Sequence, residues 1–181
     1  MIYVFLAEGF EEVEAVAPID ILRRAELNVA TVGVGRKTVT GSHGIPVVAD
    51  VIDCEIAPDE NCEGVILPGG MPGTLNLEKN QTVQKFIDYA IENNLIIGAI
   101  CAAPSILGHK GILNGKQAVC YDGFETQLFG AKIGSTSVCR DGNIITAVGA
   151  GAALEFGFKL TEAFLDNKQA NRIKESMKCI Q

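Results

Sequence analysis

Short, almost wholly apolar runs alternate along the chain with longer segments of helical periodicity, and this alternation restricts the fold more than any other feature. A continuous apolar run is typical of a parallel strand that is buried on both faces, because such a strand has no side in contact with water. Strands are therefore predicted at Ile2–Ala7, Asn28–Val34, Gly64–Leu67, Leu95–Ile100 and Gln117–Tyr121.

The segments between and after these runs carry the signals of helices and turns. A short extended piece is expected at Pro46–Ala49. Asp141-Gly142, between the apolar segments Ile133–Cys139 and Asn143–Val148, is a strong hairpin signal. Helices are predicted at Glu11–Glu26, Thr82–Glu92, Ala102–Leu107, Ala152–Leu165 and Lys168–Met177.

Repeated β-α-β units favour parallel strands joined by right-handed crossovers, with helices on both faces of the sheet. The expected fold class is α/β, with a flavodoxin-like, doubly wound, mostly parallel sheet and a small antiparallel hairpin, in a single domain over residues 1–181. Ligands of such sheets bind beyond the carboxyl ends of the strands. The candidate site segments therefore begin just after Ala7, Leu67, Ile100, Tyr121 and Val148.

The composition argues against several kinds of partner. A formal net charge of −7 leaves no basic stripe for a nucleic acid backbone. No run reaches the ~20 apolar residues of a membrane span, and the apolar start lacks a basic leader, so we expect a cytoplasmic protein without a membrane partner. Six cysteines without a C-x-x-C pair and only two histidines predict neither disulfides nor a metal site. No dinucleotide or phosphate-loop motif occurs, so no cofactor is expected.

Cys101 is the residue that most strongly suggests chemistry. It follows the strand predicted at Leu95–Ile100 and precedes Ala102-Ala103-Pro104-Ser105, a series of small residues that opens a helix. A nucleophile on a tight strand-to-helix turn needs small neighbours, because the backbone folds back on itself there. The partial positive charge of the helix N-terminus is expected to favour thiolate over thiol. The alternative is a buried structural cysteine.

Glu14 is the second candidate residue. Ala17, Pro18 and Ile21 share its face of the predicted helix, so its carboxyl group should point into the protein, where its pKa would rise. Pro18 removes the helical hydrogen bond to the carbonyl of Glu14, at a cost of ~3 kcal/mol or more. Local rules are often broken at functional sites, which favours a role for Glu14. A surface glutamate on a frayed helix is the alternative.

A glycine-rich turn and a loop histidine complete the candidate site. Pro68-Gly69-Gly70-Met71-Pro72-Gly73 follows a predicted strand, and the backbone amides of Gly69 and Gly70 could approach an oxyanion or a carboxylate closely. A plain turn would have the same composition. His43 lies in a glycine-flanked loop, where it could reach the rim of a site or simply be exposed to solvent.

In combination, these motifs resemble the DJ-1/ThiJ/PfpI superfamily, and its DJ-1 and ThiJ branch most of all. The matching segments follow the family's order across nearly the whole chain, at Glu11–Glu14, Pro18–Asp20, Val65–Gly70, Ala99–Pro104 and Gly149–Phe156. The resemblance implies a flavodoxin-like fold and a homodimer. It also implies that Cys101 is a reactive, oxidation-prone cysteine, that protonated Glu14 is its hydrogen-bond partner, and that the amides of Gly70 and Ala102 form an oxyanion-type pocket.

The chain departs from the family's pattern at several positions. Ala102 and Ala103 stand where members have a histidine or a glycine, and Val148 and Ala150 replace an arginine and a proline. Tyr121 corresponds to a site histidine of the DJ-1 branch, and His43 to a pocket arginine. Ala102, Tyr121 and His43 are therefore candidate substrate-binding residues beside the catalytic pair.

Three functions remain open on this basis. The first is cofactor-independent glyoxalase or deglycase-type chemistry on small 2-oxoaldehydes, which needs one nucleophile and one acid or base. The second is an oxidative-stress sensor or chaperone that responds to peroxide through Cys101. The third is a peptidase or amidotransferase-like hydrolase. It is disfavoured because histidine is scarce and His109 would lie ~12 Å beyond Cys101 along the helix.

Overall fold

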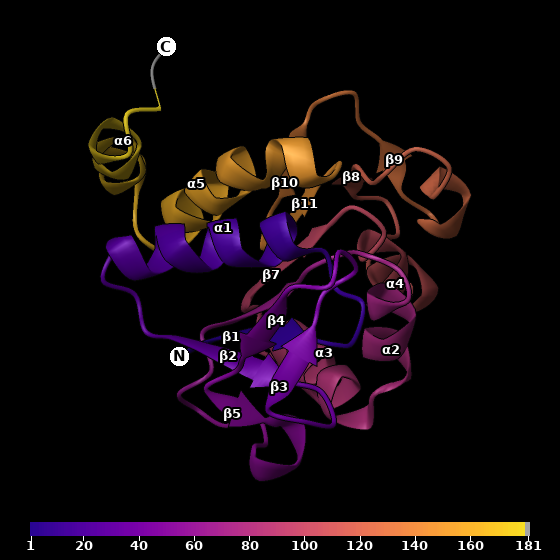
Figure 1. Cartoon of the computed structure of the whole chain (residues 1–181). Coiled ribbons are helices and arrows are strands. Elements are labelled where there is room, and N and C mark those ends of the chain that lie inside the picture. Colours follow the sequence, from indigo (N-terminus) through magenta and orange to yellow (C-terminus); the bar gives the residue numbers. More distant parts are fainter. Residues whose placement is uncertain (180–181) are drawn as a thin grey trace.

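A computed structural model describes residues 1–179 of the chain, so the predicted span of 1–181 includes two residues outside this range. A seven-stranded sheet forms the centre, in the order β10-β11-β7-β6-β1-β2-β5 (Figure 1). All neighbouring strands in it are parallel except β10 and β11. The strands are β1 (Ile2–Leu6), β2 (Val29–Gly33), β5 (Val51–Ile52), β6 (Gly64–Leu67), β7 (Ile96–Ile100), β10 (Val138–Asp141) and β11 (Ile144–Ala147).

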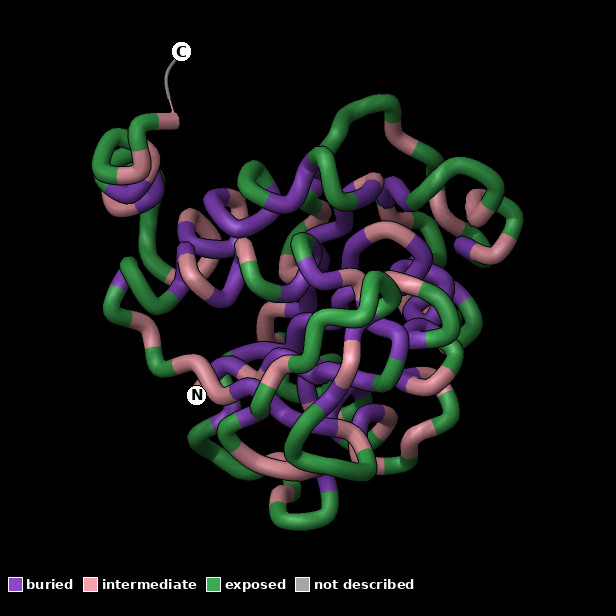
Figure 2. Tube along the Cα trace, in the orientation of Figure 1, coloured by how far each residue is buried: buried purple, intermediate pink, exposed green. Residues whose placement is uncertain are grey.

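Helices cover both faces of this sheet. On one face, α1 and α5 pack over the side chains of Ile2, Val4 and Leu6, while Phe5 and Ala7 point to the opposite face, towards α3. Buried residues accordingly gather along the central strands and the inner sides of the helices (Figure 2). The helices are α1 (Glu12–Arg24), α2 (Gly73–Lys79), α3 (Gln81–Glu92), α4 (Pro104–His109), α5 (Ala153–Phe164) and α6 (Asn167–Ser176). The predicted doubly wound, mostly parallel sheet with its antiparallel hairpin is confirmed.

The strand predicted at Gln117–Tyr121 is confirmed only for its first two residues, and it does not join the main sheet. Strand β8 covers only Gln117–Ala118, and it pairs with β9 (Lys132–Ile133) in a separate two-stranded sheet. The ladder stops there because the N–H of Val119 donates to Thr146 Oγ1 and the N–H of Tyr121 donates to the carbonyl of Cys101. The segment therefore runs over the end of the main sheet instead of joining it.

Three further elements differ from the sequence-based expectations. The predicted strand at Ile133–Cys139 is divided, because Ile133 belongs to β9 and β10 begins at Val138. Helix α2 was not predicted, since Pro72-Gly73 has the composition of a turn. Strand β4 (Pro46–Val48) pairs antiparallel with the unpredicted β3 (Thr38–Thr40), and residues 41–45 form the tip of this hairpin.

The close packing of α1 against α5 positions the first turn of α1. A methyl group added to Gly157 would lie 2.6 Å from Ile21 Cδ1 and 3.2 Å from Pro18 Cα, so only a glycine allows this approach. Glu11 caps the helix by accepting the N–H of Glu14 at 2.7 Å. The capped end of α1 thus lies at the carboxyl edge of β1 and β6, where ligands of such sheets bind.

None of the helices within residues 1–179 is both long enough and apolar enough to span a bilayer.

Candidate active site around Cys101 and Glu14

Cys101 sits at the end of β7 in a backbone conformation that is unusual for a side chain of its type. Its φ angle is 64°, in the left-handed region that residues other than glycine rarely occupy. The turn is held by hydrogen bonds from the Cys101 N–H to the carbonyl of Ala147, at 2.9 Å, and from the Ala103 N–H to the carbonyl of Ile100, at 3.0 Å. Such strain is found where a side chain must be held in a defined direction.

Glu14 reaches this turn from α1. Its side chain is almost completely buried, with 1% exposure, and its Oε2 accepts the N–H of Gly69 at 3.0 Å. A methyl group on Gly69 would lie 2.6 Å from both Glu14 Oε2 and Cys101 Cβ. The absence of a side chain at residue 69 therefore lets the carboxyl group of Glu14 and the thiol of Cys101 lie against each other. A hydrogen bond joins these two groups.

The environment of Glu14 makes it a suitable acid and base near neutral pH. Burial raises the pKa of Glu14 to about 7, and the charge of Glu11 adds to this rise. Hydrogen bonds from Cys101 and from the backbone N–H groups of Gly69 and Ala150 act in the opposite direction, because they stabilise the carboxylate. A group with a pKa near the working pH can both take up and release a proton efficiently.

The expectation that Cys101 is a thiolate at rest is wrong. Burial raises the pKa of Cys101 to about 12, and the Glu14 carboxylate contributes further to the rise. Helix α4 begins only at Pro104, so its N-terminus is separated from the sulfur by a turn. The backbone N–H groups of Gly70 and Ala102 lower the pKa of the thiol, but burial and the neighbouring carboxylate outweigh them. The thiol must therefore lose its proton during a reaction, and Glu14 is in contact with it.

The two glycines of the predicted oxyanion pocket have different partners. The Gly69 N–H is bound to Glu14, whereas the N–H groups of Gly70 and Ala102 hydrogen-bond to the Cys101 sulfur. Gly70 has a φ of 88°, which directs its amide in a way that other residues rarely can. An oxygen atom bonded to the sulfur, or to a carbon attached to it, would lie near these two donors.

Tyr121 lies beside the Glu14 carboxyl group, at the solvent side of the Glu14–Cys101 pair. Its side chain is half exposed. A methyl group added to Gly149 would lie 3.3 Å from Cδ2 of the Tyr121 ring and 3.8 Å from Glu14 Oε1, so the ring and the carboxyl group lie on either side of Gly149. A hollow of about 390 Å³ opens beside it. Its lining consists of Tyr121, Asp122, Ser137 and the five residues of 148–152. A small molecule approaching Glu14 from this side would contact the tyrosine ring.

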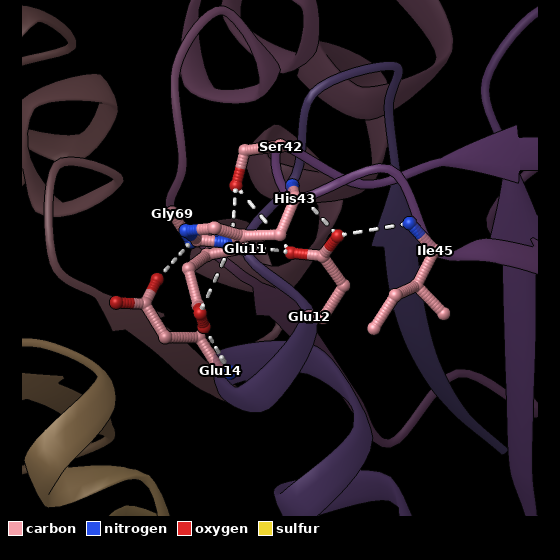
Figure 3. Close-up of polar contacts among 7 residues, drawn as sticks. All are labelled: Glu11, Glu12, Glu14, Ser42, His43, Ile45 and Gly69. Atoms are coloured by element: carbon pink, nitrogen blue, oxygen red, sulfur yellow. Dashed lines mark hydrogen bonds and ion pairs between the residues drawn. The ribbon is translucent and has the colours of Figure 1, made fainter.

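Both histidines are engaged with glutamates. His43 Nδ1 lies 2.9 Å from Glu12 Oε2 and 3.9 Å from Glu11 Oε1 (Figure 3). His109 Nδ1 lies 2.5 Å from Glu78 Oε1. Among the hydrogen bonds within residues 1–179, none joins either imidazole to Cys101.

Two residues that contact the site were not identified from the sequence. Glu11 was not among the candidate site residues, yet its side chain accepts the N–H of Glu14 and its charge raises the pKa of the Glu14 carboxyl group. Ala150, whose amide bonds to Glu14, carries no polar side chain that could have marked it.

Comparisons of sequence and of structure with known proteins lead to the same family. Residues 1–163 match the model of the DJ-1/PfpI family. The chain is 30% identical to protein dj-1beta of Drosophila melanogaster over 96% of this chain and 94% of that protein. It is 27% identical to a glutathione-independent glyoxalase of Caenorhabditis elegans, over 92% of this chain and 89% of that one. In DJ-1 homolog B of Arabidopsis thaliana, the match is 33% identical and spans 40% of the relative's length.

Solved structures agree closely with the fold. An oxidized DJ-1 of Toxoplasma gondii superposes with a TM-score of 0.93 and is 32% identical, with 97% of this chain and 96% of that chain covered. A cysteine-to-alanine variant of a DJ-1 superfamily protein from Salmonella typhimurium has a TM-score of 0.92 and 32% identity, with 98% and 97% covered.

Proposed function

The chain belongs to the DJ-1/PfpI family, and from this membership and its site we propose that it is a cofactor-independent glyoxalase with deglycase-type reactivity, acting on small 2-oxoaldehydes. The observation that carries the proposal is the buried contact between the Glu14 carboxyl and the Cys101 thiol. This pair provides one nucleophile and one group that exchanges protons near pH 7. The relative from Caenorhabditis elegans that is named a glutathione-independent glyoxalase supports the choice of reaction.

In the first step, the Glu14 carboxylate accepts the thiol proton while the Cys101 sulfur attacks the aldehyde carbon of methylglyoxal. The carbon–oxygen π bond becomes an oxyanion, which takes up a proton to give a hemithioacetal. The N–H groups of Gly70 and Ala102, which hydrogen-bond to the sulfur, are suitable donors to that oxygen.

In the second step, a proton leaves the former aldehyde carbon and another is delivered to the neighbouring carbon, with Glu14 as the carrier. The hemithioacetal thereby becomes the thioester of a 2-hydroxy acid, and no external oxidant or reductant is needed. Water then hydrolyses the thioester, which releases lactate and restores the Cys101 thiol. The site thus uses only a thiol, a carboxyl group and backbone donors.

The test follows both the loss of methylglyoxal and the formation of lactate, with purified protein and a chelator present. We expect Cys101→Ser to abolish turnover and Glu14→Gln to lower it by about a hundredfold or more. Cys54→Ser, at an exposed cysteine, is the matched control and should behave as wild type. Negligible lactate from folded wild-type protein, or activity that disappears with the chelator, would contradict the proposal.

A second candidate function is redox sensing at the same sulfur. It is favoured by the N–H groups of Gly70 and Ala102 that hydrogen-bond to Cys101, because they would also bind an oxygen added to it. One peroxide molecule would convert the thiol to a sulfenic acid and release water, and a second would give the sulfinic acid. Mass spectrometry after graded peroxide should find added oxygen on Cys101 before the exposed Cys54. Oxidation in the reverse order would argue against a sensor.

The assembly and the location of the protein are also proposals. A homodimer is supported by exposed apolar side chains on α1 and the β3–β4 hairpin: Val13, Val16, Ile45 and Val48, with exposed fractions of 51%, 47%, 56% and 67%. Light scattering should give twice the chain mass, and Val16→Asp should reduce it. A cytoplasmic location is supported by six free thiols, which suit a reducing compartment. Cell fractionation tests the location.

A further inference from the structure

Three side chains that the chemistry at Cys101 does not use converge above the first turn of α1. They are Glu11, Glu12 and His43, and Figure 3 shows the imidazole lying over the two glutamates. One potential ligand atom from each lies within 4.8 Å of the other two. Within residues 1–179, this is the only group of three or more such side chains that meets so closely.

Each carboxylate is held by backbone N–H groups through one oxygen and directs the other towards His43. Glu11 Oε2 accepts the N–H of Glu14, whereas no hydrogen bond of the described residues uses its Oε1, which lies 3.9 Å from His43 Nδ1. Glu12 Oε1 accepts the N–H groups of His43, at 2.8 Å, and Ile45, at 3.3 Å, while its Oε2 lies 2.9 Å from His43 Nδ1. Backbone donors therefore fix both carboxylates with one oxygen directed towards the imidazole. Ser42 Oγ donates to Glu12 Oε2 at 3.4 Å and lies 3.2 Å from His43 Nδ1, so a bound ion would take the place of these contacts.

The loop around His43 gives Glu12 little freedom to turn away. A methyl group on Gly41 would lie 2.3 Å from both Cδ and Oε1 of Glu12, so the carboxylate is packed directly against the loop. Glu12 is 6% exposed, whereas the His43 side chain is 70% exposed. The imidazole thus lies exposed beside two fixed oxygen ligands, and solvent has access to the group.

The two separations from His43 Nδ1 are compatible with a single divalent ion. Ligands bound to zinc at about 2.0–2.1 Å lie about 2.9 Å apart at a right angle and about 3.4 Å apart in a tetrahedron. The observed 2.9 Å and 3.9 Å to His43 Nδ1 bracket this range. Two carboxylates and a neutral imidazole carry a charge of −2, which a divalent cation balances, and nitrogen with oxygen ligands is a donor set that zinc accepts.

We propose that Glu11 Oε1, Glu12 Oε2 and His43 Nδ1 form a zinc-binding site, with water completing the coordination. The ion would cross-link the tip of the β3–β4 hairpin to α1. The site depends on a departure of this chain from the family's pattern, because the arginine to which His43 corresponds cannot ligate a metal ion. The inference goes beyond the proposed reaction, since no step at Cys101 uses the ion.

Calorimetric titration of the whole protein with zinc chloride tests the site directly. Wild type should bind one zinc ion per chain, and zinc should raise its melting temperature. His43→Arg places a positive charge beside Glu12 but offers no lone pair to a metal ion. Glu11→Gln removes one carboxylate ligand and retains an oxygen that can cap the helix. Each should weaken zinc binding by at least about tenfold. His109→Gln is the matched control, because His109 also pairs with a glutamate, Glu78, but has no third ligand.

Cobalt substitution and Cys101→Ser separate this site from binding by thiols. Cobalt in the proposed site should show weak visible bands without sulfur-to-metal charge transfer, and Cys101→Ser should bind zinc as wild type does. The proposal is overturned if wild type binds no zinc, if His43→Arg binds as tightly as wild type, or if Cys101→Ser abolishes binding. These readouts do not involve turnover, so an absence of lactate formation would contradict the proposed function and leave the zinc site standing.

Discussion

The Glu14 carboxyl group and the Cys101 thiol meet across the α-carbon of Gly69. A methyl group there would lie 2.6 Å from Glu14 Oε2 and 2.6 Å from Cys101 Cβ, and 2.9 Å from the carbonyl oxygen of Ile100. The contact between acid and nucleophile therefore depends on a third residue that has no side chain. It also explains why a proton can pass directly between the two groups.

Gly69→Ala should separate this pair. The added methyl has rigid neighbours on two sides, so the carboxyl group or the turn must shift. A displacement of about 1 Å at a reacting centre can lower the rate by about a hundredfold. We expect such a loss in kcat/KM for methylglyoxal. Gly111→Ala is the control, because a methyl group there meets nothing within 4 Å and residue 111 does not line the hollow beside Tyr121. Equal activity of the two variants would disprove the role of Gly69.

Glu14→Gln should stabilise the protein at alkaline pH. Burial raises the folded-state pKa of Glu14 to about 7 from its ordinary value of 4.5, so the native state binds the extra proton between these values. Stability contributed by this group is then complete below pH 4.5 and falls as the pH rises to 7. The loss is up to about 3 kcal/mol, and a glutamine avoids it.

Denaturant unfolding of wild type and Glu14→Gln at pH 4.5 and pH 8 measures this difference. The glutamine variant should gain stability relative to wild type only at the higher pH. Glu92→Gln, at an exposed position at the end of α3, serves as the control for removing a negative charge. A gain of the same size at both pH values would rule out the pKa of Glu14 as its cause.

Glu14→Gln should make the alkylation of Cys101 faster, although it makes turnover slower. The Glu14 carboxylate helps to raise the pKa of the thiol to about 12, so removing its charge lowers that pKa and increases the thiolate fraction at pH 8. Mass spectrometry should therefore show faster labelling of Cys101 by iodoacetamide in the variant, with Cys54 as the internal standard. Slower labelling would mean that Glu14 activates the resting thiol instead.

Gly157→Ala should destabilise the packing of α1 on α5. Alanine normally favours a helix over glycine by about 1 kcal/mol. Here its methyl group would lie 2.6 Å from Ile21 Cδ1, and overpacking of this kind costs about 1–3 kcal/mol. The midpoint of urea denaturation should fall, and turnover should fall with it if the position of Glu14 depends on this contact. A higher midpoint would show that the helices can separate without loss.

Much of the fold follows from local patterns that a sequence displays directly. Apolar runs such as Ile2–Ala7 and Leu95–Ile100 predict buried strands because burial on both faces leaves no polar positions. The same reasoning located Cys101 beyond β7 and turned Glu14 inward. It failed beyond Ala118, where the N–H groups of Val119 and Tyr121 bond to Thr146 and Cys101, residues that no local pattern connects with this segment.

The sequence alone therefore determined the sheet and its helical layers, and it selected the two side chains that we propose to react. Tertiary structure decided the state of those side chains. The protonated thiol of Cys101 follows from desolvation and from the charge of Glu14, which α1 brings to it across Gly69. The Glu11, Glu12 and His43 cluster also joins residues about thirty positions apart. Periodicity encodes burial and local hydrogen bonds, whereas desolvation and distances between remote groups exist only after the elements have packed.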